Sequence, residues 1–108
     1  MDFELLIITD CPNSAPAAEL FKEAMEAADL NAAELKIREL RTEAEAQVVG
    51  FHGSPTFTVA GKDLFVSAAE PALSCRIYPT PTGLAGLPVF EELLGLLTKA
   101  ISENDTTD

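Results

Sequence analysis

The chain is poor in the residue types that build metal centres and disulfide frameworks. It has no tryptophan, one histidine and two cysteines among 108 residues. Two cysteines are too few for the disulfide scaffold of a small secreted domain. With one histidine and no Cys-x-x-Cys pair, they also fall short of the four clustered ligands of a structural zinc site. We therefore expect no metal and no cofactor, and cysteines that are either reactive or simply buried.

Basic residues are also scarce. Seven lysines and arginines stand against eighteen acidic residues, for a formal net charge of -11. Such a charge repels nucleic-acid phosphates and anionic lipid surfaces, so we expect neither as a partner. No apolar run approaches membrane-spanning length, and the first ten residues lack the basic residues that begin a secretory signal. The expected location is cytoplasmic.

Length and composition favour one globular domain, because 47% of the residues are hydrophobic and 23% are charged. We assign this domain to residues 1–101. The remaining segment, SENDTTD at 102–108, is polar and acidic. It is expected to be a disordered tail.

The first half of the chain shows alternating strand and helix patterns. Apart from Glu4, residues 3–8 form a continuous apolar run, typical of a strand covered on both faces. An amphipathic helix is predicted from Ala17 to about Leu30. Residues 33–40 alternate, with Leu35 and Ile37 on the apolar side, which predicts a strand with one solvated face. A short helix is expected over 42–50, since Thr42 and Glu45 form a capping box and Gly50 can end it.

The second half predicts a hairpin and a last helix. Residues 56–60 and 64–66 favour strands, with the turn at 61–63. Residues 67–87 lack periodicity and predict a long functional or mobile loop. The last helix is expected to start near Pro88. This order predicts an α/β fold in which the first two strands are parallel, the hairpin adds antiparallel strands, and helices cover both faces.

Two short segments carry a resemblance to a known family. Cys11-Pro12-Asn13-Ser14 lies at the first strand-to-helix turn, and Gly53-Ser54-Pro55-Thr56 opens the hairpin. Together with the order of elements, these segments resemble the thioredoxin fold over nearly the whole chain. The resemblance implies a central mixed sheet of about four strands, in the order β-α-β-α-β-β-α, with helices on both faces. It also implies a cis proline at Pro55 that lies against a reactive Cys11.

A narrower resemblance comes from CPN, GSPT and the later SCRIY-x-TP-x-GLAG. These are similar to a group of small bacterial thioredoxin-like proteins, some of which carry the label alkylmercury lyase. The chain departs from the dithiol pattern of the family, because Ser14 stands where dithiol members have a second cysteine. The resemblance therefore supports the fold better than it supports disulfide reductase activity.

Cys11 is the candidate nucleophile. If a helix began directly after it, with Pro12 as first residue, the thiolate would be stabilised by the helix N-terminus. Pro16 argues for a later start, with Ser14 as N-cap or a kink at Pro16, and both place Cys11 further from the helix. The alternative is that Cys11 is a small semi-buried residue at a tight turn. Its position favours the reactive interpretation.

Cys75 is the candidate resolving residue, although it could equally pack under the loop. Arg76 could stabilise a thiolate there, or point into solvent. The resemblance implies that Ser54, Pro55 and Thr56 offer free backbone groups which pair with an extended substrate in β-fashion. Tyr78 could rim a pocket or be part of the loop packing.

These residues predict a thiol-based redox protein. Cys11 would attack a disulfide, peroxide or electrophile, and Cys75 would resolve the adduct. The expected partner is a disulfide-containing protein or a low-molecular-weight thiol. Two alternatives remain open: a non-catalytic thioredoxin-fold binding module, and heavy-metal or organomercurial handling by the two thiols.

Overall fold

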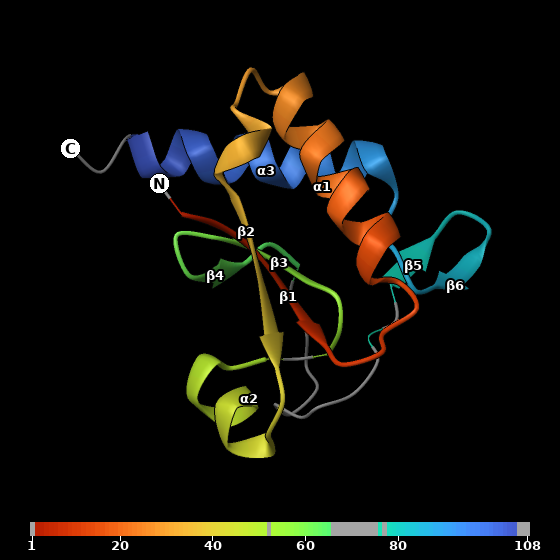
Figure 1. The fold of residues 1–108 in the computed structure, drawn as a ribbon. Coiled ribbons are helices and arrows are strands. Elements are labelled where there is room, and N and C mark those ends of the chain that lie inside the picture. The colour runs from red at the N-terminus through yellow and green to blue at the C-terminus, as the bar shows by residue number, and fades with distance from the viewer. Residues whose placement is uncertain (1, 52, 66–75, 77, 106–108) are drawn as a thin grey trace.

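A mixed four-stranded sheet organises the chain (Figure 1). The computed structural model describes residues 2–51, 53–65, 76 and 78–105. The elements, in chain order, are β1 (Phe3–Ile8), α1 (Ser14–Ala27), the short 3-10 helix η1 (Ala32–Glu34), β2 (Leu35–Leu40), α2 (Glu43–Val49), β3 (Thr56–Val59), β4 (Lys62–Asp63), β5 (Tyr78–Thr80), β6 (Gly83–Ala85) and α3 (Phe90–Asp105).

The strands of the main sheet lie in the order β2-β1-β3-β4. β1 runs parallel to β2, with Phe3 opposite Leu35, and antiparallel to β3, with Phe3 opposite Val59. The position of β1 between two strands explains why all of its residues except Glu4 are apolar, since a central strand has to be covered on both faces. The prediction of an α/β fold with a parallel first crossover and an antiparallel hairpin is confirmed.

Helices cover both faces of the sheet. α1 and α3 lie together on one face (Figure 1), over a core that includes Leu5 from β1 and Phe57 from β3. The next residue of β1, Leu6, points to the opposite face, because side chains alternate along a strand. There it joins a smaller core with Leu40 and, from α2 and the residues after it, Ala46 and Phe51.

α2 forms as its sequence predicts. The Thr42 hydroxyl accepts a hydrogen bond from the Glu45 backbone N–H at 3.1 Å, and the Glu45 carboxylate accepts one from the Arg41 N–H at 3.1 Å. The helix ends at Gly50, which has a φ of 67° and therefore the left-handed conformation that glycine adopts without strain. These contacts are local, which is why the sequence pattern is sufficient to predict them.

The hairpin turn is shorter than predicted. Val59 pairs with Lys62, so the turn consists of Ala60 and Gly61 alone, with φ values of 53° and 79°. Positive φ at both positions gives the backbone twist that a two-residue hairpin needs. The predicted turn at 61–63 was therefore wrong, because Lys62 and Asp63 belong to β4. Val66, predicted in the second strand, lies outside the described residues.

β2 is less buried than its alternation predicted. Ile37, on the apolar side of the strand, is 52% exposed. β2 stands at one end of the strand order. The helices that pack on the middle of the sheet therefore leave most β2 side chains only partly covered, although Leu40 at the end of the strand is buried.

Part of the predicted loop is regular. Within residues 78–85, β5 and β6 form a small antiparallel pair, with Tyr78 opposite Ala85 and Thr80 opposite Gly83. α3 starts at Phe90, two residues after Pro88, and continues to Asp105, so that residues 102–105 are helical; residues 106–108 lie outside the described part. Among the helices described, none combines the length and the apolar character needed to cross a membrane.

Candidate functional site

A tight turn carries the chain from β1 to α1 and holds Cys11. Asp10 has a φ of 59°, and the Cys11 N–H donates to the Ile8 carbonyl at 3.4 Å. The Cys11 carbonyl in turn accepts from the Ser14 N–H at 3.2 Å. Cys11 is a free thiol with 8% of its surface exposed. The thiol is thus held in a defined position at the carboxyl end of the central strand.

Helix α1 starts one residue earlier than the capping argument predicted. Its N-cap is Asn13, whose carbonyl accepts the Ala17 N–H at 2.9 Å, and Ser14 is the first helical residue. Ser14 as N-cap was therefore wrong, and exposed Pro12 is not a helical residue either. Pro16 is tolerated inside the helix because N–H groups of the first turn have no partner within the helix. Cys11 lies two residues before the N-cap, outside the helix.

The turn is closed from a distant part of the chain. A Cβ placed on Gly86, just after β6, would lie 2.2 Å from the Asn13 side-chain nitrogen. Any larger residue at position 86 would therefore push Asn13 away. This close approach gives a packing reason for the last glycine of the GLAG segment.

The Gly53–Thr56 segment lies next to the same turn. The Ser54-Pro55 peptide bond is cis, the geometry that the resemblance implied at this proline. The Ser54 hydroxyl oxygen accepts a hydrogen bond from the Ile8 N–H at 3.2 Å. Ile8 is also the residue whose carbonyl holds Cys11. Ser54, Pro55 and Thr56 are buried.

The carbonyls of this segment are not free. Gly53 O accepts the Thr56 hydroxyl at 2.5 Å, and Ser54 O accepts the Arg76 backbone N–H at 2.9 Å. Pro55 O accepts the Tyr78 hydroxyl. The expectation of free backbone groups was therefore wrong for the Ser54 and Pro55 carbonyls, because Arg76 and Tyr78 of the same chain donate hydrogen bonds to them.

Arg76 is buried rather than solvated, with 6% of its side chain exposed. Its Nη1 donates to Asp63 Oδ2 at 2.6 Å and to Thr56 Oγ1 at 3.3 Å, and Nη2 donates to the Phe65 carbonyl at 2.9 Å. The guanidinium also lies 4.9 Å from the centre of the Tyr78 ring. A buried charge needs such a complete set of partners, which identifies Arg76 as the centre of a structural network.

Tyr78 contacts Arg76 and also belongs to the aromatic core on the sheet. Its ring packs edge-on against Phe57 and Phe65, at centroid distances of 6.0 and 4.9 Å. Burial raises the pKa of Tyr78 well above its ordinary value, so its hydroxyl remains a hydrogen-bond donor to Pro55. Of the two roles considered for Tyr78, the structure places it in packing.

Asp63 and Phe65 are the parts of this network that sequence reasoning missed. Asp63 was assigned to a turn, yet it binds both Arg76 and the Phe65 N–H, the latter at 3.0 Å. Arg76 lies next to apolar residues in the sequence, and an arginine is rarely buried without an acidic partner. This position could therefore have indicated that a carboxylate binds it. Cys75, the predicted resolving residue, lies outside the described residues.

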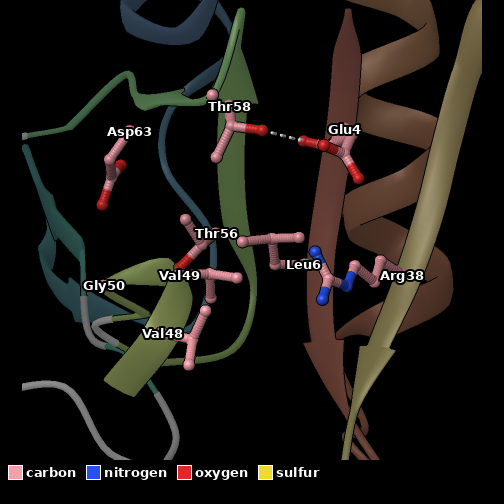
Figure 2. A pocket seen from close by; sticks show the side chains of 10 residues that line it. Glu4, Leu6, Arg38, Val48, Val49, Gly50, Thr56, Thr58 and Asp63 are labelled. Atoms are coloured by element: carbon pink, nitrogen blue, oxygen red, sulfur yellow. Dashed lines mark hydrogen bonds between the residues drawn. The ribbon is translucent and has the colours of Figure 1, made fainter. Parts of the chain in front are cut away.

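A groove opens on the α2 side of the sheet, with a volume of about 430 Å³ (Figure 2). Its floor includes Leu6, and the Thr58 hydroxyl on its wall donates to the Glu4 carbonyl at 3.1 Å. Thr56 and Asp63 line the groove and also bind Arg76. Cys11 is not among the lining residues, so the groove and the thiol are separate features.

Within the part of the chain that the structure describes, no three His, Cys, Asp or Glu side chains gather to hold a metal ion. Comparison of the chain with protein-family models, with curated proteins and with solved structures finds no match. What the site does therefore has to follow from its own geometry.

Proposed function

We propose that this chain is a cytoplasmic thioredoxin-like protein in which Cys11 is the nucleophile of thiol–disulfide exchange. The observation that carries the proposal is the 3.2 Å hydrogen bond from the Ile8 N–H to the Ser54 hydroxyl. It joins the cis Ser54-Pro55 segment to the turn that holds Cys11. The thioredoxin-like assignment is supported by the strand order β2-β1-β3-β4 and by α1 and α3 sharing one face.

The chemistry needs two exchange steps. In the first, the Cys11 thiolate attacks one sulfur of a disulfide; a new S–S bond forms, the old one breaks, and the leaving sulfur takes a proton from water. In the second, another thiolate attacks the mixed disulfide and releases Cys11. Ser14 cannot supply that thiol. It must come from Cys75 or from a low-molecular-weight thiol.

A non-catalytic binding module is the rival function. It is favoured by the 8% exposure of Cys11 and by the occupied carbonyls of Gly53, Ser54 and Pro55. In that case Cys11 only fills space at the turn. Replacing both thiols with serine separates the two: a binding module keeps its partner, whereas a redox protein loses its activity.

The direct test is to equilibrate the folded protein in glutathione buffers and to identify the state of each thiol by alkylation and mass spectrometry. We expect a mixed disulfide on Cys11, absent in Cys11→Ser. If Cys75 resolves it, Cys75→Ser will accumulate more of this adduct than the wild type. An equal amount assigns resolution to the external thiol, and a Cys11 that never reacts in the folded protein overturns the proposal.

A further inference from the structure

The backbone pairing position beside the cis proline is filled by the chain itself. An extended polypeptide docks on a strand edge by exchanging backbone N–H and C=O hydrogen bonds. The bond from the Arg76 N–H to the Ser54 carbonyl, 2.9 Å long, is of this backbone type. The Gly53 and Pro55 carbonyls on either side are occupied by the Thr56 and Tyr78 hydroxyls. Each of these three carbonyls thus already accepts one hydrogen bond from the chain itself, with which an incoming segment would have to compete.

Arg76 is held in this position by its side chain. Its guanidinium binds Asp63, Thr56 and the Phe65 carbonyl, and it lies over the Tyr78 ring. Moving residue 76 away from Ser54 would separate a buried arginine from its carboxylate, which is strongly unfavourable. We call Arg76, Asp63 and Tyr78 the clasp.

The clasp also fits tightly on the segment that it covers. Gly53 has a φ of 119°, and a Cβ built on it would lie 2.9 Å from the Arg76 Cβ. The backbone of residue 53 and the Cβ of Arg76 are therefore in direct contact. A second chain has no space between them.

We infer that the clasp makes the site selective for low-molecular-weight disulfides over extended protein segments. This rests on the proposed function, in which Cys11 is the nucleophile. A small disulfide needs no backbone pairing to react. Cys11 attacks the disulfide RSSR, forms Cys11–S–SR and releases RSH; a small thiol R′SH then forms RSSR′ and regenerates Cys11, so that atoms and electrons balance with small thiols alone.

The test compares two disulfides as substrates of the wild-type protein, glutathione disulfide and insulin. Rates of mixed-disulfide formation on Cys11 are measured and divided by the rate of each disulfide with a free cysteine peptide. We expect glutathione disulfide to be favoured by up to about tenfold, the factor that the one unmade backbone hydrogen bond at the Ser54 carbonyl amounts to. Insulin reacting as fast or faster overturns this inference but leaves the proposed function standing. No reaction with either disulfide overturns both.

Variants of the clasp provide a second test of the inference. Tyr78→Phe removes the hydroxyl on the Pro55 carbonyl and keeps the ring, and Asp63→Asn removes the charge that holds Arg76. We expect both to raise the relative rate with insulin and to leave the rate with glutathione disulfide unchanged. Lys99→Gln, which removes an exposed ion pair on α3, is the control and changes neither.

Circular dichroism establishes that each variant is folded. If Asp63→Asn does not fold, Tyr78→Phe and the wild-type comparison decide the question. A folded Tyr78→Phe whose preference for glutathione disulfide is unaltered contradicts the role of the clasp, because a purely structural hydroxyl would change stability but not the ratio of the two rates.

Discussion

Arg76 and Asp63 form an ion pair in which the arginine is buried and the carboxylate partly buried: Nη1 lies 2.6 Å from Oδ2, and the two side chains are 6% and 19% exposed. The pair joins the end of the β3–β4 hairpin to the segment that leads into β5. Because Arg76 also donates its backbone N–H to Ser54, one residue links the hairpin, the cis-proline segment and the small second sheet.

Asp63→Ala is expected to lower the free energy of unfolding by about 3–5 kcal/mol, since it leaves the Arg76 charge buried without its carboxylate. Urea denaturation of the variant measures this. The matched control is Lys36→Ala, which removes an exposed pair with Asp2 at 3.8 Å and should change stability by less than about 1 kcal/mol. Equal effects of the two substitutions would show that burial of the Arg76 pair is unimportant.

Tyr78 is the one tyrosine of the chain, so its ionisation can be followed by tyrosinate absorbance. Its pKa in the folded protein is raised by burial. We expect no tyrosinate in the folded protein near pH 10. In the urea-unfolded chain, by contrast, the same tyrosine should ionise with its ordinary pKa of about 10.

The sign of the linked stability change follows. The unfolded chain loses the Tyr78 proton first, so this contribution to stability is full below about pH 10 and falls as the pH rises beyond it. Tyr78→Phe removes that part of the pH dependence. Tyrosinate forming near pH 10 while the protein is still folded would contradict the burial of this hydroxyl.

Gly53→Ala is expected to destabilise the protein by more than about 1 kcal/mol, because an alanine would be strained at a φ of 119° and would collide with Arg76. Gly95→Ala is the control, since a Cβ at that position in α3 meets open space. It should stabilise the helix by up to about 1 kcal/mol. Thermal unfolding of the two variants gives the comparison; a neutral Gly53→Ala would mean that Arg76 does not press on this segment.

The first residues of α2 and α1 predict different effects on stability when a hydroxyl residue is replaced with alanine. Thr42→Ala removes the hydroxyl that accepts the Glu45 N–H and should cost about 1 kcal/mol. Ser14→Ala should change stability by less than about 0.5 kcal/mol, because Ser14 is the first helical residue and caps nothing. Denaturant midpoints decide between these, and a large loss for Ser14→Ala would restore Ser14 as the N-cap.

Local features could be read from the sequence. The Thr42, Glu45 and Gly50 signals predict α2 because every contact involved spans only a few residues. β1 is apolar at every position except Glu4, and this likewise predicts a central strand, since burial on both faces favours apolar residues at successive positions. Cys11 was correctly placed at the turn between strand and helix.

Tertiary structure decided the features that depend on distant partners. Ser14 and Asn13 both suit an N-cap, and the choice between them depends on how the turn after β1 is held. β5 and β6 are strands of three residues each, too short and too rich in proline and glycine to show a period of two.

The occupation of the Ser54 and Pro55 carbonyls is the clearest case. Arg76 and Tyr78 lie more than twenty residues along the chain from them. No local sequence pattern predicts which carbonyl will accept a hydrogen bond from an N–H or hydroxyl so far along the chain. The sequence by itself therefore determined β1, α2 and the place of the thiol between the first strand and helix, because those follow from contacts within a few residues. Only the folded chain decided that the cis-proline segment is covered, because that follows from burying Arg76 with Asp63.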